Sequence, residues 1–350
     1  MGPGQRATPP DRTAQWFPLA MTDSANRPAL PSAHGGRGRW LSDTSADRVF
    51  LLLAGGAGYL VLAVLLAAAL SMAWGGRQAF ATFGWHFFTS TDWDAVNKKF
   101  GAVVPIYGTV VSSTIAIAIA VPISLGIAIF LTEIAPRWLR APVSTAIELL
   151  AAIPSIIYGM WGLFVFVPFM SEHIQPWLIA HLGSIPGLGR LFKGAPIGIG
   201  MLTAGIILAI MIIPFITAVM RDVFLAVPSG LKDGCLAMGS TTWEVIRNVV
   251  LPYTRSAVIG AIFLGLGRAL GETMAVTFVL GNAHELKLSL LEPGNSIAAT
   301  LANEFTEADS DMYLSSLIAL GFVLFLVTLV TLAIAKLLLL TVQQREAKGR

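Results

Sequence analysis

The sequence predicts an all-α integral membrane protein, built as a bundle of six transmembrane helices behind an N-terminal tail. The first observation is compositional: 12% of the 350 residues are charged and 55% are hydrophobic, with a mean hydropathy of +0.73. A soluble domain carries about 25% charged residues, so this chain has too little polar surface to face water on all sides. The second observation is that its apolar residues are gathered into long stretches with almost no charge.

These stretches are long enough to cross a bilayer, because about 20 apolar helical residues span its ~30 Å hydrocarbon core. Buried helices of a soluble protein would explain one such stretch but not a succession of them. The predicted spans are 49–73, 103–131, 149–170, 196–220, 257–280 and 312–335. Pro154 and Pro214 are expected to kink the third and fourth spans.

Both ends of the chain are predicted to be tails. Residues 1–47 are rich in Pro, Gly, Ala, Ser and Arg and show no periodicity, a composition typical of disorder. We expect no secretory signal peptide there, because no apolar core precedes a small-residue cleavage site. Met21 offers an alternative start, which the N-terminal peptide identified by mass spectrometry would decide. Residues 341–350 are expected to form a short C-terminal tail.

The orientation follows from the basic residues. Most of the 23 lysines and arginines fall in the N-terminal tail and in the connections on that same side of the predicted bundle. Basic residues favour the cytoplasmic side, so both termini are predicted to be cytoplasmic. Acidic residues gather in the last outer connection, at Glu285, Glu292, Glu304, Glu307, Asp309 and Asp311. The aromatic residues of 74–102 are expected to form an interfacial belt, and Asn295 or Ser296 to cap a short surface helix.

Several functional classes are excluded or unsupported. Cys235 is the single cysteine, so no internal disulfide can form, and the five histidines show no ligand spacing that would predict a metal site. A net charge of +3 gives no indication of nucleic-acid binding. The chain has no GxxxxGK[ST] motif for ATP phosphates and no nucleophile–base constellation. We therefore expect a non-enzymatic protein that binds no cofactor itself.

Residues 221–255 form the longest inner connection between predicted spans. Apolar positions over 231–238 predict a short amphipathic helix, which Gly239 ends before a second helix leads to Pro252. Such a helix suits docking into a groove of a cytoplasmic partner. An ordinary loop lying on the membrane surface explains the spacing equally well.

The predicted fifth span contains two charges, Arg268 near its middle and Glu272 four residues later. That spacing places both side chains on one face of a helix, within pairing reach. A charge at mid-bilayer costs about 2.5–3.5 kcal/mol on insertion scales, so the pair should face the bundle interior or a water-filled path. The guanidinium fork suits an oxyanion, with Glu272 holding Arg268 when no anion is bound. A salt bridge that only fixes packing is the alternative.

Glycines surround this charge pair. Small residues spaced four apart let membrane helices approach closely, and Gly267 and Gly271 have this spacing. The glycines are Gly260, Gly265, Gly267 and Gly271.

The inner connection resembles the EAA signature of ABC importer permeases, Glu-Ala-Ala-x3-Gly-x9-Ile-x-Leu-Pro. The matching residues are Asp233, Gly234, Cys235, Gly239, Val249, Leu251 and Pro252. Asp for Glu, Gly-Cys for Ala-Ala and Val for Ile are the departures, so the ATPase partner need not be exchangeable. In that family this segment is the coupling helix that docks on the ATPase.

The segments GRALGETMAVTFVLGN, PGNSIAATLANEF and ELLAAIPSIIYGMWGLF sharpen this resemblance to phosphate-specific permeases of the PstC type, over a permease domain of about residues 48–340. It implies a type I importer fold, with Arg268 and Glu272 taking part in phosphate passage. It also implies a PstA-like second permease, two copies of a cytoplasmic ATPase that binds ATP, and a periplasmic phosphate-binding protein. A permease for sulfate, molybdate or phosphonate, a secondary ion-coupled transporter, and an added role in phosphate signalling are the alternatives.

Overall fold

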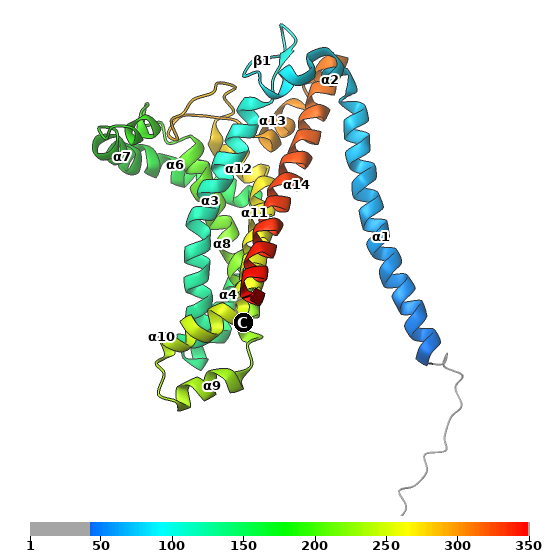
Figure 1. Ribbon diagram of the computed structural model, residues 1–350. Coiled ribbons are helices and arrows are strands. Elements are labelled where there is room, and N and C mark those ends of the chain that lie inside the picture. Colours follow the sequence, from blue (N-terminus) through cyan, green and yellow to red (C-terminus); the bar gives the residue numbers. More distant parts are fainter. Residues whose placement is uncertain (1–42, 349–350) are drawn as a thin grey trace, which may run out of the picture. The chain divides into compact units, whose positions relative to one another are not determined.

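The computed structural model describes residues 43–348 (Figure 1), so most of the predicted N-terminal tail lies outside the described residues. The chain divides into two compact units, Met1–Leu60 and Val61–Arg350. Helix α1 (Asp43–Gly75) begins in the smaller unit, inside the range assigned to the tail. At the other end, helix α14 (Asp311–Lys348) continues into residues 341–350, where a tail was expected.

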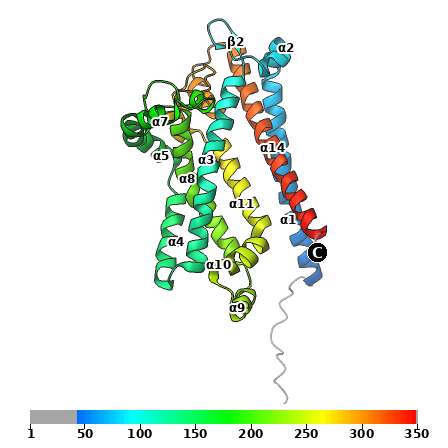
Figure 2. The ribbon, with the colours of Figure 1, turned by 60° about the vertical axis from the view of Figure 1, so that its left-hand side comes forward.

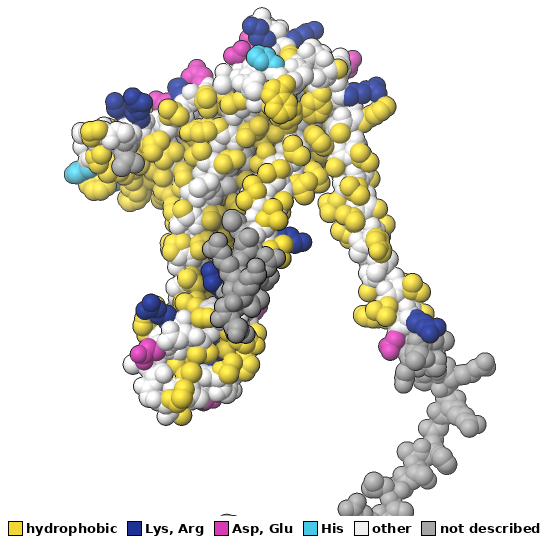
Figure 3. All heavy atoms as spheres, viewed as in Figure 1, with side chains coloured by type: hydrophobic (Ala, Val, Ile, Leu, Met, Phe, Trp, Pro, Cys, Tyr) yellow, Lys and Arg dark blue, Asp and Glu magenta, His cyan; other side chains and the backbone are white. Residues whose placement is uncertain are grey.

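Among the described residues, six helical segments are long and apolar enough to cross a membrane, which confirms the predicted helix bundle. They are 47–75, 103–134, 155–182, 201–225, 242–270 and 311–337. Large apolar side chains cover the lateral surface of the larger unit (Figure 3), as expected where hydrocarbon is the solvent. The third and fifth segments differ most from the predicted spans 149–170 and 257–280.

The third membrane-spanning segment begins later in the sequence than predicted, because Pro154 separates two helices. Helix α4 (Arg137–Ala151) stops before this proline, and α5 (Ser155–Trp161) begins directly after it. A proline disfavours helical backbone at the residue before it, so the expected kink is a complete break. The span then continues through η3 (Gly162–Phe166), α6 (Val167–Phe169), η4 (Met170–Ile174) and α7 (Gln175–Leu182).

Helix α8 (Met201–Leu225) is the centre of the larger unit. Its most apolar window is 61% buried, against at most 28% for the other spans. It packs against α3 (Val103–Ile129), which continues as η2 (Phe130–Ile134), and Figure 2 shows the two helices side by side. Gly205 allows the close approach, since a Cβ there would lie 2.6 Å from the Ile115 side chain.

Further helices pack on this pair. A helix over 242–270 is built from α10 (Thr242–Val245), η6 (Ile246–Val250) and α11 (Leu251–Leu270). It packs on both α3 and α8. The short α12 (Met274–Leu280) lies against α5 and α8. A further short helix, α9 (Ser229–Ala237), follows α8. It lies at the opposite end of the unit from the hairpin of β1 (Trp93–Asp94) and β2 (Lys99–Phe100) (Figure 1).

The end that carries the hairpin, here the hairpin end, has an aromatic core. Its elements are α2 (Arg77–Phe83), η1 (Gly84–Phe88), β1 (Trp93–Asp94), β2 (Lys99–Phe100), η5 (Leu188–Phe192) and α13 (Ile297–Glu304). Phe87 and Phe100 are buried, so part of the expected interfacial belt is core. Trp74 and Trp85 are exposed as a belt requires.

Helix α13 has the predicted cap, because the Ser296 hydroxyl accepts a hydrogen bond of 3.1 Å from the Ala299 amide. The helix is buried rather than lying on the surface, with Ala298, Ala299 and Thr300 enclosed. Its approach is held by α3: the Thr109 hydroxyl accepts from the amide of Ile297 at 2.9 Å. The loop before α13, residues 281–296, therefore rests directly on α3.

Gly108→Ala is expected to destabilise the assembled transporter, because a Cβ there would clash with the carbonyl oxygen of Asn295. Overpacking of this kind costs about 1–3 kcal/mol, so the melting temperature of the purified protein in detergent should fall. Gly126→Ala on the same helix is the matched control, since its Cβ would meet nothing within 4 Å. Equal melting temperatures for the two variants would contradict this close approach.

Candidate functional site

The two charges of the fifth span lie on opposite sides of a helix break. Helix α11 ends at Leu270, Gly271 leaves helical geometry with φ −93° and ψ 2°, and α12 begins at Met274. The prediction that Arg268 and Glu272 share one helix face is therefore wrong. Within residues 43–348, no salt bridge joins these two side chains.

The break itself explains where these charges sit. Arg268 lies in the last turn of α11, where unpaired carbonyl groups favour a cation. Glu272 lies just before α12, and its Oε1 accepts a hydrogen bond of 3.4 Å from the amide of Ala275. The start of a helix favours an anion. Each charge is thus stabilised by a different helix end rather than by the other charge.

Arg268 keeps a charge that no carboxylate of the described residues neutralises by direct contact. Its guanidinium carbon lies 5.3 Å from the ring centroid of Phe215 on α8, a cation–π geometry. The side chain is half-buried. An unneutralised guanidinium with unused donors can bind an oxyanion.

The surrounding glycines act differently from one another. Gly265 is a packing glycine, since a Cβ there would lie 2.5 Å from Ile216 on α8. A Cβ at Gly260 or Gly267 would meet nothing within 4 Å, and at Gly271 only the carbonyl oxygen of Gly267 at 3.7 Å. The spacing of Gly267 and Gly271 therefore does not pack helices within this chain.

The inner connection is shorter than the predicted 221–255, because α8 continues to Leu225 and the next membrane-spanning segment begins at Thr242. Asp233, Gly234 and Cys235 lie on α9, whose predicted short helix is present. Gly239 has φ +90° and makes the turn that follows. Leu251 and Pro252 lie inside the continuous 242–270 segment rather than at the end of a loop.

Sequence reasoning missed how α10 is started. Thr241 and Glu244 form a capping box: the Thr241 hydroxyl accepts from the Glu244 amide at 3.3 Å, and the Glu244 carboxylate accepts from the Thr241 amide at 2.7 Å. The Thr-x-x-Glu pattern before an apolar run could have predicted this helix start.

The connection presents apolar side chains to its surroundings. Met238 is 80% exposed and Trp243 is 61% exposed, and Leu231 and Leu236 are about half exposed. Asp233 is exposed among them, while Cys235 packs against the core. We call this set, Leu231, Asp233, Leu236, Met238 and Trp243, the α9 surface.

Helix α9 is fastened to α3 by an ion pair. The ammonium of Lys232 lies 2.6 Å from a carboxylate oxygen of Glu133 in η2, and both side chains are largely buried. A buried pair that loses one partner costs several kcal/mol, so α9 and the end of α3 are held as one body. Glu148 is likewise bound to Arg221 at 2.8 Å. Glu133 and Glu148 therefore each link two elements of the fold.

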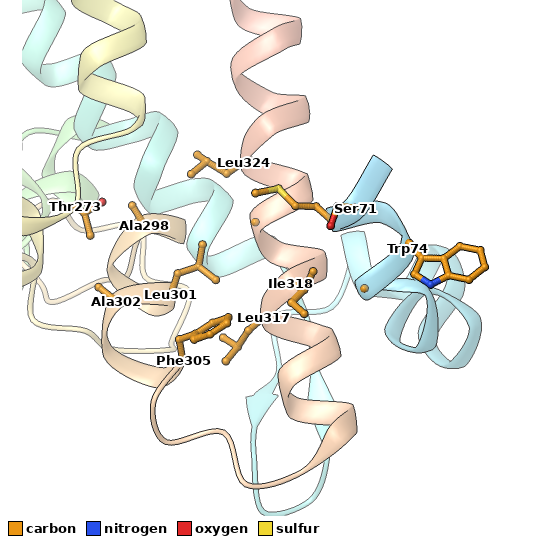
Figure 4. A pocket seen from close by; sticks show the side chains of 13 residues that line it. Ser71, Trp74, Thr273, Ala298, Leu301, Ala302, Phe305, Leu317, Ile318 and Leu324 are labelled. Atoms are coloured by element: carbon orange, nitrogen blue, oxygen red, sulfur yellow. The ribbon is translucent and has the colours of Figure 1, made fainter. Parts of the chain in front are cut away.

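Two cavities lie on the hairpin-end side of the larger unit. One, of about 700 Å³, is lined by Ser71–Gly75, α13 and α14, and Thr273 at the helix break borders it (Figure 4). Its walls are mostly apolar. The other, of about 530 Å³, is polar and is lined by residues that include Trp93, Lys99 and His284. Among the described residues, no group of His, Cys, Asp or Glu is arranged to hold a metal ion.

Comparison with known proteins assigns the architecture. Residues 120–343 match the family of binding-protein-dependent transport system inner membrane components. The chain is 61% identical over 309 residues to the phosphate transport system permease protein PstC of Xylella fastidiosa, covering 88% of this chain and 95% of the relative. It is 54% identical over 323 residues to the protein of the same name from Mesorhizobium japonicum, covering 92% and 99%.

A solved structure supports the fold alone. One chain of a bacterial alginate ABC transporter, determined in complex with its alginate pentasaccharide-bound periplasmic protein, superposes with a TM-score of 0.54 at 17% identity. The match covers 83% of this chain and 94% of that one. The chain therefore belongs to the family of binding-protein-dependent transport system inner membrane components, as a PstC-like, multi-pass and non-catalytic permease subunit that works with other ABC transporter components.

Proposed function

We propose that this chain forms part of the pore of an ATP-driven importer that moves inorganic phosphate into the cytoplasm by alternating access. The observation that carries the proposal is Arg268, a half-buried guanidinium at the helix break after Leu270 with no carboxylate bound to it among the described residues. The names of relatives that are 54–61% identical state phosphate transport. Residues 264–282, which contain this arginine, lie within the aligned family region.

Phosphate suits this geometry for two reasons. A planar guanidinium presents a fork of donors that matches a phosphate oxyanion. An anion passing through the membrane also needs a positive group to offset its lost hydration. Arg268 supplies this charge at the helix break, and it does not first have to separate from a bound carboxylate. Glu272, four residues on, sets an opposing charge near the path and so limits how tightly the anion is held.

ATP would act from outside this chain. We assign the coupling role to the segment that holds Asp233, Gly234, Cys235, Gly239, Leu251 and Pro252, with ATP bound by a partner subunit. The exposed apolar residues of the α9 surface suit a groove on that partner. The Lys232–Glu133 ion pair would transmit movement of α9 to α3, and the continuous 242–270 segment would carry it to Arg268.

The assembly that follows has four kinds of subunit. A PstA-like second permease would complete the pore, two ATPase copies would contact the coupling segments, and a periplasmic phosphate-binding protein would dock at the hairpin end. This arrangement places both termini in the cytoplasm, as the distribution of basic residues predicts. Transport of another oxyanion is the competing proposal, and a substrate panel distinguishes it.

Arg268→Gln is expected to reduce phosphate uptake strongly. Losing a hydrogen bond to a charged group costs about 1.5–3 kcal/mol, which is roughly a 10- to 150-fold loss of rate at subsaturating phosphate. The measurement is ³²P-phosphate uptake in cells that lack the native gene, with membrane levels checked by immunoblot. Arg137→Gln, at an exposed arginine of α4 away from the hairpin end and from α9, is the matched control.

Normal uptake by the Arg268→Gln variant would remove the translocation role. If wild type restores sulfate or molybdate uptake but not phosphate uptake, the substrate assignment is wrong and the importer class alone stands.

Gly239→Ala is expected to weaken coupling, because Gly239 has φ +90° and a residue with a Cβ is strained by about 1–2 kcal/mol in the left-handed region. ATP hydrolysis by the reconstituted transporter should respond several-fold less to the loaded binding protein. Gly230→Ala is the control, since it lies in α9 with ordinary backbone and open space around its Cβ. An equal response from both variants would show that this turn does not transmit the signal.

A further inference from the structure

The carboxylate of Glu304 connects four separate segments of the chain at the hairpin end, its own helix α13 and the three segments that carry its hydrogen-bond partners. Oε2 of Glu304, the last residue of α13, accepts hydrogen bonds from the Trp93 indole at 2.7 Å and from the Tyr313 hydroxyl at 2.6 Å. Oε1 lies 2.7 Å from Nε2 of His284. The donors come from β1, from the loop 281–296 and from the start of α14. We call these four residues the Glu304 node.

The node is enclosed and its rings are stacked. The Glu304 side chain is 13% exposed. The rings of Trp93 and His284 are nearly parallel, with centroids 5.5 Å apart, and Tyr313 stacks on Phe100 at 5.2 Å. Burial opposes ionisation of Glu304, but its hydrogen bonds from His284, Tyr313 and Trp93 outweigh burial and lower the pKa of this carboxyl group. Glu304 is therefore ionised throughout the neutral range.

The histidine in the node contacts the carboxylate through Nε2. Its Nδ1 is buried and has no hydrogen-bond partner. The node is thus one carboxylate bound by three ring-bearing side chains, Trp93, His284 and Tyr313, which makes it a hydrogen-bonded anchor.

The loop that carries His284 is fastened to the end of α12. The amide of Gly294 donates to the carbonyl oxygen of Leu280, and the amide of Ala283 donates to the carbonyl oxygen of Gly294, both at 3.0 Å. Asn295 follows directly, with its Nδ2 3.1 Å from Nε2 of His284. Anchoring the loop at His284 therefore also anchors the last turn of α12.

Helix α12 links this anchor to the helix break. It has only seven residues, about 10 Å of helix at 1.5 Å per residue, with Glu272 and Thr273 immediately before its start. We expect a helix this short to move as one rigid body. Motion of its Leu280 end would therefore also displace the residues at the helix break.

We propose that Glu304 is a positioning residue for transport, which fixes the loop 281–296 and thereby holds α12 in the orientation that places Glu272 and Thr273 at the break beside α11. This inference rests on the proposed function, because it takes the break as part of the anion path. Glu304 itself lies outside that path and contacts no part of α11 that the structure records.

The test combines a structural readout with a transport readout on the assembled transporter. Glu304→Gln keeps the side-chain shape but removes the negative charge and replaces one acceptor oxygen of the node by an amide donor. Tyr313→Phe removes one donor and keeps the ring that stacks on Phe100. Glu307→Gln is the matched control, an exposed acid three residues along the same connection.

Hydrogen–deuterium exchange is measured over peptides covering 281–296 in the absence of phosphate. Glu304→Gln should exchange there roughly tenfold faster, the factor that 1.4 kcal/mol represents, with a smaller increase for Tyr313→Phe. The maximal rate of phosphate uptake should fall in the same order, with the half-saturating phosphate concentration unchanged. Glu307→Gln should match wild type in both measurements.

Two results would overturn the inference. Unchanged exchange in Glu304→Gln or, should that variant not assemble, in Tyr313→Phe would show that the node does not hold the loop. Faster exchange with an unaltered maximal uptake rate would show that holding the loop does not position the break. Failure of the proposed function looks different, because Arg268→Gln would then transport normally while exchange in Glu304→Gln still increased.

Discussion

A bilayer offers no water to an unpaired backbone amide, and this constraint governs the part of the chain that matters most for transport. The predicted fifth span, 257–280, is broken between Leu270 and Met274. The break leaves carbonyl groups without helical partners on one side and amides without helical partners on the other. Local side chains satisfy part of this need: the Thr273 hydroxyl donates to the carbonyl oxygen of Gly271, and the Glu272 carboxylate accepts from the amide of Ala275. The protein must supply the remaining stabilisation by burying the second half-helix.

That burial depends on glycines in the neighbouring span. Ala275, Val276, Val279 and Leu280 of α12 are almost fully enclosed. A Cβ at Gly159 on α5 would lie 2.8 Å from Phe278, and a Cβ at Gly162 would lie 3.0 Å from Ile207 and 3.1 Å from Val279. The third span can therefore reach both α8 and α12 only because these positions lack side chains. The break at Pro154, which starts α5 afresh, lets this glycine-bearing helix follow its own direction.

Much of the architecture was predictable because hydrophobicity and length alone define membrane spans. The number of spans, the short helix α9 and the turn at Gly239 follow from local signals in the sequence. The break after Leu270 does not, since Leu-Gly-Glu-Thr-Met contains nothing that forbids a continuous helix. The two contacts that organise the ends of the bundle are also hidden, because Lys232 and Glu133 are 99 residues apart and Glu304 and Trp93 are 211 apart. The candidate charges were identifiable, but their separate stabilisation by two helix ends required the fold.

The central claim is that the break beside Arg268 lies on a path whose access alternates between the two sides of the membrane. The most direct measurement replaces the single native cysteine by Cys235→Ser, introduces Thr273→Cys, and follows modification by a membrane-impermeant thiol reagent in proteoliposomes with and without ATP. If access alternates, the introduced thiol reacts from one side of the membrane in the nucleotide-free transporter and from the other side when ATP is bound. A thiol that reacts from neither side in either condition, while uptake by the variant persists, would contradict it.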